Sequence, residues 1–103
     1  MTFAKPLIGA FTLMSVFATA SVALAYTGGQ LAPQAKVSLE QARAIALKAR
    51  PGDITDQELE KEKGGSGLRY SFDIKKGKVT YEVGVDAKSG KILENAAEGP
   101  HPD

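Results

Sequence analysis

The sequence contains no cysteine and only one histidine among its 103 residues. Without cysteine the chain can form neither a disulfide bond nor a thiolate metal site, and it cannot be a lipoprotein acylated on cysteine. The single histidine, His101, stands between two prolines in a polar tail, without the partner groups that a catalytic base or a metal site needs. We therefore predict that the protein is not an enzyme and has no cofactor and no metal site.

An excess of charge of either sign is also missing. The 13 basic residues nearly balance the 12 acidic residues, and the formal net charge is +1. Nucleic-acid-binding domains usually carry a pronounced basic surface, so we expect no nucleic-acid partner. A chain of this length has room for one small domain. Apolar burial alone must hold that domain together.

One long uncharged run is present at the start of the chain. Lys5 precedes residues 7–24 (LIGAFTLMSVFATASVAL), which include no charged residue. Ala23 and Ala25 then supply the A-x-A pattern of a signal-peptidase site. We predict a cleavable signal peptide over residues 1–25, export by the general secretory route, and no stable membrane anchor after cleavage.

An uncleaved membrane anchor is the competing interpretation, because the uncharged run is close to the length that spans a bilayer. The run is rich in Ala, Thr and Ser, and no basic residue follows it before Lys36. We therefore favour cleavage, with Tyr26 as the first mature residue. The mature protein is then periplasmic or secreted. We expect residues 26–36 to be a flexible lead-in that does not pack.

A helix is predicted over residues 39–49. Ser38 and Gln41 have the spacing of a capping box, and the pair Pro51-Gly52 ends the helix. Apolar residues recur at helical spacing on one side of this segment, namely Ala42, Ile45, Ala46 and Ala49.

Two segments, 68–75 and 78–86, alternate strictly between apolar and polar residues, which is typical of half-buried strands. A two-residue hairpin turn at Lys76-Gly77 is predicted to join them. This turn would pair four apolar positions: Ile74 with Val79, Phe72 with Tyr81, Tyr70 with Val83, and Leu68 with Val85. We expect the opposite, polar face to meet water, and the helix to cover the apolar face.

The remaining segments are shorter. Residues 53–63 fit either a charged edge strand or a short helix, and we favour the strand because charged edges protect small sheets. A short strand is expected around residues 91–95, followed by a disordered tail over residues 96–103. The predicted fold is therefore α+β, with one amphipathic helix packed on an antiparallel sheet of three to four strands.

The chain resembles the PepSY family in two motifs. Residues 81–93 (YEVGVDAKSGKIL) are similar to the closing hairpin of that family, "YxVxVDAxTGKVL", with Ser89 at the usual Thr position. The helix matches the opening pattern "EAxxIALxxxPG" through Glu40, Ala42, Ile45, Ala46, Pro51 and Gly52. The resemblance assigns residues 37–95 to a PepSY-like domain. It implies a helix followed by an antiparallel sheet, and a role in inhibiting or regulating peptidases.

Two groups of residues stand out as candidates for function. Lys75, Lys76 and Lys78 cluster at the predicted hairpin tip, and we name them as the candidate contact with a partner. The segment from Asp86 to Gly90 is similar to the first positions of a calcium-binding loop, but Lys88 stands where an oxygen ligand is needed. We interpret that segment as a tight turn, in which Asp86 accepts backbone N–H groups and Gly90 has positive φ.

The leading functional hypothesis is an exported, non-catalytic module that binds and regulates a partner protein, either a secreted or periplasmic peptidase or another envelope protein. A propeptide acts on the protease to which it is attached, but we identify no protease domain in this sequence. We therefore expect any inhibition by this chain to act in trans, on a separate peptidase. The alternative is an envelope structural protein or a protein that binds a small ligand or metal ion, with the acidic segment around Glu58, Glu60 and Glu62 or the C-terminal tail as the contact.

Overall fold

The structure is a computed structural model that describes residues 25–99. Residues 1–24 of the predicted signal peptide, including Ala23, and His101 lie outside the described residues, and Ala25 is the first residue within them. In chain order the described part forms a 3-10 helix, an α-helix and four strands: η1 (Gly29–Gln34), α1 (Leu39–Ala49), β1 (Asp53–Lys61), β2 (Leu68–Lys76), β3 (Val79–Asp86) and β4 (Ile92–Ala97).

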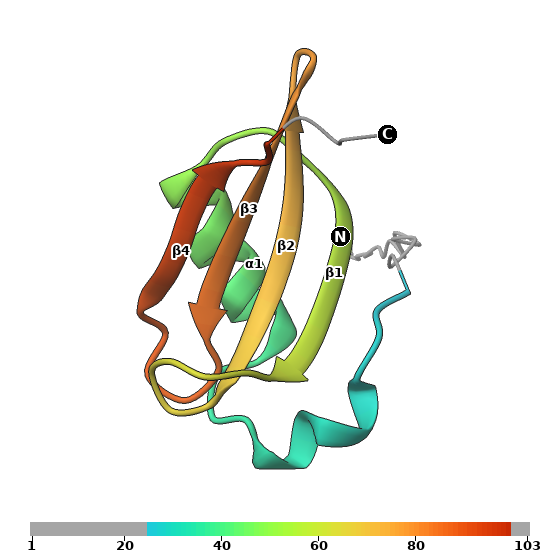
Figure 1. Ribbon diagram of the computed structural model, residues 1–103. Helices are drawn as coiled ribbons and strands as arrows, with labels where there is room; N and C mark the ends of the chain where they lie inside the picture. The colour runs from blue at the N-terminus through green and yellow to red at the C-terminus, as the bar shows by residue number, and fades with distance from the viewer. Residues whose placement is uncertain (1–24, 100–103) are drawn as a thin grey trace, which may run out of the picture.

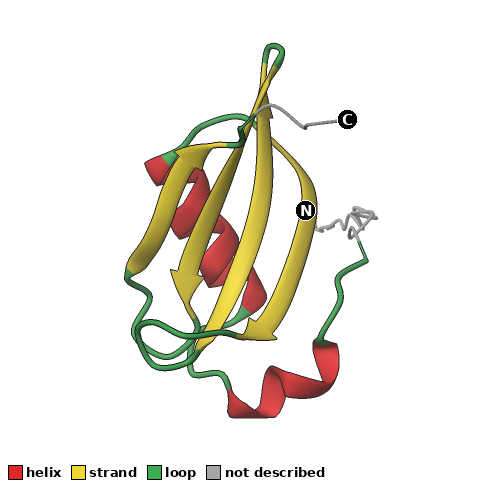
Figure 2. Cartoon of the chain, viewed as in Figure 1, coloured by secondary structure: helices red, strands yellow, loops and turns green. Residues whose placement is uncertain are grey.

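The four strands form one antiparallel sheet in the order β1-β2-β3-β4, so that each strand lies beside its neighbour in sequence. The α-helix α1 lies across one face of this sheet (Figure 1, Figure 2). The predicted α+β architecture of one helix on an antiparallel sheet is confirmed. Residues Asp53–Lys61 form strand β1, so the favoured interpretation of that segment is confirmed and the helical alternative is wrong.

The helix begins where the capping box predicts. Ser38 Oγ accepts a hydrogen bond from the Gln41 amide at 3.0 Å, and the Ser38 amide donates to Gln41 Oε1 at 2.9 Å. Two backbone N–H groups that a helix start leaves unpaired are thereby satisfied. Ala42 and Ala46 are fully buried on the side facing the sheet. Their small side chains allow the helix backbone to approach the strands closely.

The core between helix and sheet consists mainly of apolar residues from the three longer strands, and Phe72 at its centre is 0% exposed. Besides the two helical alanines, the buried apolar residues are Leu59, Leu68, Tyr70, Phe72, Ile74, Val83, Val85 and Ala87. Burial of an apolar side chain contributes about 1.5–3 kcal/mol. This cluster is therefore the principal source of stability in a domain without disulfides.

The register of the β2–β3 hairpin differs from the predicted one by two residues. The turn residues are Gly77 and Lys78, and Ile74 pairs with Tyr81. Gly77 has φ of 64°, which suits the first central position of a II′ turn, whereas the predicted turn would have placed Lys76 at that position. A two-residue shift keeps every apolar side chain on the same face. Its visible consequence is Val79, which is 42% exposed near the hairpin tip.

The opposite face of the sheet is less exposed to water than predicted, because Arg69 and Ser71 are 8% and 7% exposed. Arg69 crosses over Gly84, where a Cβ would lie 3.1 Å from Arg69 Nη1. The Arg69 Nη2 group donates to the Lys63 carbonyl at 3.1 Å, and the loop after β1 covers the guanidinium. A glycine in the neighbouring strand thus makes room for a buried arginine.

The expected flexible lead-in is instead packed against the domain. Thr27 forms a parallel bridge with Glu58 of β1, and its carbonyl accepts a hydrogen bond from the Leu59 amide at 2.8 Å. Tyr26, Leu31, Ala32 and Ala35 then pack against the core. The expectation failed because the Gly, Pro and Gln residues of this segment are typical of a flexible chain, while its binding to the edge of β1 depends on tertiary contact.

Ala96 and Ala97, which were expected to belong to a disordered tail, lie in a strand instead. Strand β4 continues through Ala96 and Ala97, and the Glu98 amide donates to the Thr80 carbonyl at 2.8 Å. Alanine has a low strand propensity, which is why the sequence pattern ended at Asn95. Pairing with β3 satisfies the backbone of these two residues and overrides that propensity. The residues after Gly99 lie outside the described part.

Candidate functional site

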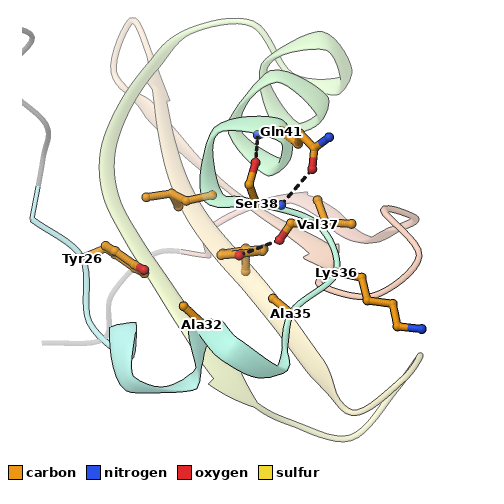
Figure 3. A pocket seen from close by; sticks show the side chains of 9 residues that line it. Tyr26, Ala32, Ala35, Lys36, Val37, Ser38 and Gln41 are labelled. Atoms are coloured by element: carbon orange, nitrogen blue, oxygen red, sulfur yellow. Dashed lines mark hydrogen bonds between the residues drawn. The ribbon is translucent and has the colours of Figure 1, made fainter.

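An open pocket of about 310 Å³ lies where η1 meets the beginning of α1 (Figure 3). Two tyrosines from distant parts of the chain contribute to its walls, Tyr26 from the N-terminal segment and Tyr70 from β2. The other lining residues are Ala32, Ala35, Lys36, Val37, Ser38, Leu39 and Gln41. The volume falls at the lower end of the range of small-ligand sites, and it is large enough for a bulky apolar side chain.

The walls of the pocket are held by hydrogen bonds that also shape the fold. The Tyr70 hydroxyl donates to the Val37 carbonyl at 2.7 Å, which fixes the loop before α1 to strand β2. The capping box of Ser38 and Gln41 holds the adjacent helix start (Figure 3). On the other side, Gly28 has φ of 94°, and any Cβ at this position would overlap the Leu59 carbonyl oxygen. Only glycine allows the N-terminal segment to approach β1 so closely.

The lining of the pocket is mixed: Ala32, Ala35 and Leu39 supply apolar surface beside the polar groups of Ser38 and Gln41. Burial raises the pKa of Tyr70, and the nearby Tyr26 raises it further, so the phenol stays neutral and keeps its role as a donor to Val37. The Lys36 side chain extends away from the pocket (Figure 3), while Tyr26, Ala32 and Ala35 face it. The pocket therefore offers both apolar surface and hydrogen-bonding groups to a side chain or small molecule that enters it.

Sequence reasoning missed this pocket because it treated residues 26–36 as flexible. A signal was nevertheless present: Leu31, Ala32 and Ala35 are apolar residues in an otherwise polar stretch, and their spacing fits one side of a short helix. Tyr26, directly after the predicted cleavage site, was a second signal. Tyr70 was predicted as a core residue, and it is 2% exposed, but its hydroxyl group also helps form the pocket.

The predicted contact residues Lys75, Lys76 and Lys78 lie together at the tip of the β2–β3 hairpin, and all three are exposed. In Figure 1 this tip projects from the opposite end of the molecule to η1. The structure therefore brings the three lysines together with one another, but not with the pocket. The exposed Val79 is the apolar residue beside them.

The turn after β3 has the predicted geometry. Asp86 Oδ1 accepts hydrogen bonds from the amides of Lys88 and Ser89 at 2.8 and 3.2 Å, and Gly90 has φ of 80°. Sequence reasoning missed Ser66, whose amide and hydroxyl also donate to Asp86, at 2.7 and 2.8 Å. Burial alone would raise the pKa of Asp86, but these hydrogen bonds outweigh it and lower the pKa to about 2. The carboxylate thus joins two loops of the fold.

The face of the sheet that α1 leaves uncovered carries several carboxylates. Asp73 stands directly opposite Asp56 of β1 and Glu82 of β3. Burial raises the pKa of Asp73 and of Glu82, and neighbouring carboxylates raise both values further. The same two causes, in the same order, raise the pKa of Glu58. This face is acidic, apart from Lys75 near the hairpin tip and the buried Arg69, which lies 3.4 Å from Glu94.

The described residues offer little for a metal ion or a membrane span. Over residues 25–99, no three His, Cys, Asp or Glu side chains are grouped as a metal ion would require. The alternating Glu58, Glu60 and Glu62, considered above as weak cation ligands, are included in that finding. Within the same residues, no helix is both long and apolar enough to cross a bilayer.

Comparison with known proteins gives one match. The sequence model of the PepSY family, described as "Peptidase propeptide and YPEB domain", matches residues 36–95. This range begins at the loop before α1 and ends within β4, so it contains the helix, the first three strands and most of the fourth. Neither a curated protein nor a solved structure matches the chain at a significant level.

Proposed function

The chain belongs to the PepSY family, and from this premise we propose that it is an exported, non-catalytic module that binds a peptidase and regulates or inhibits it in trans. The family description associates the module with peptidase propeptides. The fold is consistent with a binding role, since one helix on one sheet offers loops, edges and a pocket as contact surfaces. The bound peptidase is the proposed partner, and the module itself performs no chemistry.

The observation that best supports this proposal is the pocket between η1 and α1. Tyr26, Leu39 and Tyr70 supply apolar surface to its walls, polar groups lie beside them, and the pocket opens to solvent. Protein interfaces gain most of their affinity from a few apolar or aromatic side chains that enter well-formed pockets. The capping box and the bond between Tyr70 and Val37 hold this pocket in shape before a partner arrives, which lowers the entropy cost of binding.

Export is part of the proposal. Cleavage after Ala25 leaves Tyr26 as the first residue of the mature chain, and Tyr26 already packs against the core. The mature protein therefore starts directly at the docked segment. Mass spectrometry of protein recovered from the periplasm or medium should give the mass of a chain that starts at Tyr26. A chain that retains residues 1–25 and remains in the membrane fraction would show that the segment is an anchor.

The hairpin tip is the second proposed contact, because Lys75, Lys76 and Lys78 present three positive charges to an acidic partner. It can be separated from the pocket experimentally. In one variant Ala35→Phe fills the pocket, and in another Lys75→Glu and Lys76→Glu reverse the charge of the tip. Lys91→Glu, an exposed charge reversal in the turn before β4, is the matched control.

These variants should be tested against a panel of secreted and periplasmic peptidases, using protein purified after export. We expect the parent and Lys91→Glu to bind and inhibit at least one peptidase. Loss of inhibition with Ala35→Phe alone would assign the contact to the pocket, and loss with the hairpin variant alone would assign it to the tip. A parent protein that neither binds nor inhibits any member of the panel would refute the proposal.

The pocket also supports a second candidate function, an envelope protein that binds a small ligand with an apolar part and a polar group, because its lining is mixed and its volume falls within the range of small-ligand sites. Thermal unfolding with medium-chain alcohols and alkylphenols tests this role. A rise in Tm that Ala35→Phe abolishes would favour small-ligand binding. Calorimetric titration with calcium, zinc and copper tests the metal version of the same role, and we expect no heat of binding.

A further inference from the structure

The two edges of the sheet are protected very differently. The outer edge of β1 is partly covered by the N-terminal segment, whose Thr27 pairs with Glu58, and it has a bulge between Ile54 and Asp56. Strand β4 (Ile92–Ala97) forms the other edge, with no lysine, arginine or proline in its sequence ILENAA. Its one irregularity lies at its beginning, opposite Gly84 and Val85. Natural sheets usually blunt such an edge, because its unpaired backbone groups can accept another strand.

The direction of the free backbone groups follows from the ladder between β3 and β4. The Glu98 amide donates to the Thr80 carbonyl, so residue 98 belongs to a hydrogen-bonded pair. Hydrogen-bonded and non-hydrogen-bonded pairs alternate along an antiparallel ladder. Asn95, opposite Val83, and Ala97, opposite Tyr81, therefore direct their N–H and C=O groups away from β3. These groups form the outer edge of the sheet among the described residues.

The edge strand is held firmly from the helix side. Arg50 Nε donates to Asn95 Oδ1 at 3.0 Å, and Asn95 Nδ2 donates to the Ala49 carbonyl at 3.4 Å. The Arg50 guanidinium also lies 3.9 Å above the ring of Tyr81, in the strand next to β4. The end of α1 thus fixes the position of β4 through the Asn95 side chain and leaves its outward backbone groups unobstructed by that contact. A preorganised edge binds a strand at lower entropy cost.

The side chains along this edge define which strand would fit. On the uncovered face, Glu94 on β4 and Glu82 on β3 are acidic, and Glu98 follows the end of β4. Glu94 also forms an ion pair with Arg69 at 3.4 Å, so Glu82 is the one of these two strand residues that has no ion-pair partner among residues 25–99. Burial raises the pKa of Glu82, and so do Glu94 and Glu98, which is consistent with carboxylates at close range. On the helix-covered face, Ile92 is 39% exposed at the edge. A complementary strand would place basic side chains on the first face and apolar ones on the second.

We propose that the edge of β4 receives an extended segment of the partner protein as a fifth strand, in which basic and apolar residues alternate. Backbone hydrogen bonds to Asn95 and Ala97 supply affinity, and the alternating side chains supply specificity. A second copy of this chain is a poorer occupant, since it would bring its own acidic Glu94 against the same face. This inference deepens the proposed function, because it names the kind of segment by which a partner is held.

A synthetic peptide tests the inference without a peptidase. The probe is a fluorescein-labelled octapeptide of alternating lysine and valine, blocked at both ends, and its binding to protein purified after export is followed by fluorescence anisotropy. Two control peptides carry N-methyl groups on alternate residues, one on the lysines and one on the valines. A third control has glutamate in place of lysine. We expect the parent peptide and one methylated peptide to bind, and the other two peptides to bind at least about tenfold more weakly.

Protein variants locate the binding edge. Ala97→Pro removes an N–H group that faces away from β3, while Ala97→Val keeps that group and favours a strand. We expect Ala97→Pro to weaken peptide binding about tenfold, and Ala97→Val to bind as the parent does. Circular dichroism spectra must be the same for both variants. If Ala97→Pro unfolds the protein, the two N-methylated peptides still test whether the peptide binds as a strand. In that case one methylated peptide must bind more weakly than the other.

Three results would overturn the inference: binding of neither parent nor methylated peptides, equal binding of all of them, or a dimer of the free protein that Ala97→Pro dissociates. The last result would identify a second copy as the occupant. Failure here is distinguishable from failure of the proposed function. If the protein inhibits a peptidase but does not bind the peptide, the proposed function stands and the fifth-strand inference is refuted. If it binds the peptide at β4 but no peptidase, the fifth-strand inference stands and the proposed function is refuted.

Discussion

The Tyr70 hydroxyl donates a 2.7 Å hydrogen bond to the carbonyl of Val37, a residue 33 positions earlier in the chain. The bond joins the second strand of the sheet to the loop from which α1 begins. It also holds together two walls of the pocket, since both residues line it. One buried phenol therefore connects the stability of the helix–sheet packing with the shape of the proposed binding site.

Replacing Tyr70 with phenylalanine should destabilise the domain by about 1–2 kcal/mol, because the Val37 carbonyl loses its partner while the ring still fills the core. A loss of 1 kcal/mol lowers the Tm of a domain of this size by about 4–8 °C. Thermal unfolding followed by circular dichroism measures the change. Tyr81→Phe is the matched control, and equal Tm values for the two variants would show that the bond contributes nothing.

Replacing Phe72 with alanine should cost about 3–5 kcal/mol, because it leaves a cavity in the centre of the core. Phe72 is 0% exposed, and a small domain without disulfides or metal has only a few kcal/mol of stability. We therefore expect a large fraction of this variant to be unfolded at 25 °C, as measured by urea titration. Ile45→Ala, at a position only partly buried, should cost less. A Phe72 variant as stable as the parent would refute the assignment of the core.

The protein should lose stability in strong acid through Asp86. Its pKa is lowered from 3.8 to about 2 by hydrogen bonds from Lys88, Ser66 and Ser89 that outweigh the opposing effect of burial. The folded state therefore holds this proton less tightly than the unfolded state does. The resulting stabilisation, of about 2–2.5 kcal/mol, is fully present above pH 3.8 and is lost as the pH falls through about 2. In Asp86→Asn this part of the pH dependence should disappear from urea titrations.

The acidic face should produce the opposite trend at higher pH. Burial, followed by neighbouring carboxylates, raises the pKa of Glu58, Asp73 and Glu82 in the folded state. These groups destabilise the fold when they are ionised, so stability should rise as the pH falls from neutral through their folded pKa values. Unfolding midpoints measured between pH 7 and pH 4 test the sign. Glu82→Gln should flatten the rise, whereas a midpoint that falls steadily with pH would contradict the prediction.

Replacing Gly28 with alanine should detach the N-terminal segment and leave the sheet intact. The added Cβ would overlap the Leu59 carbonyl oxygen, and φ of 94° is itself strained for alanine. Hydrogen exchange at the Leu59 amide, which donates to Thr27, should become faster in this variant. Exchange in β2 and β3 should stay slow. Gly99→Ala, where a Cβ would contact nothing within 4 Å, is the control and should leave exchange unchanged.

The sequence allowed the main architecture to be predicted, because the deciding signals are local or strictly periodic. Ser38 and Gln41 form the predicted capping box, and the alternation from Leu68 onward placed Phe72 and Ile74 on the buried face. The position of the hairpin turn was two residues off, since alternation fixes the face of a strand but leaves its register free in steps of two. The positive φ of Gly77 favours the turn Gly77-Lys78 over the predicted turn Lys76-Gly77.

The candidate site was less predictable, because it depends on contacts between segments far apart in the chain. No local sequence pattern around Tyr26 predicts that Thr27 pairs with Glu58, 31 residues later. The burial of Arg69 similarly depends on Gly84 in the next strand and on the loop at Lys63. Local patterns carry no information about such pairs. The hairpin lysines were located correctly at the exposed tip, since a hairpin turn is itself a local feature.

The order of the strands in the sheet matches their order in the chain, and this has a consequence for the time course of folding. Each hairpin closes a short loop, so sheet formation can proceed from neighbour to neighbour without a search for distant partners. The contact between Thr27 and Glu58 spans the whole helix and is expected to form last. Closure of the pocket would then be the final event of folding.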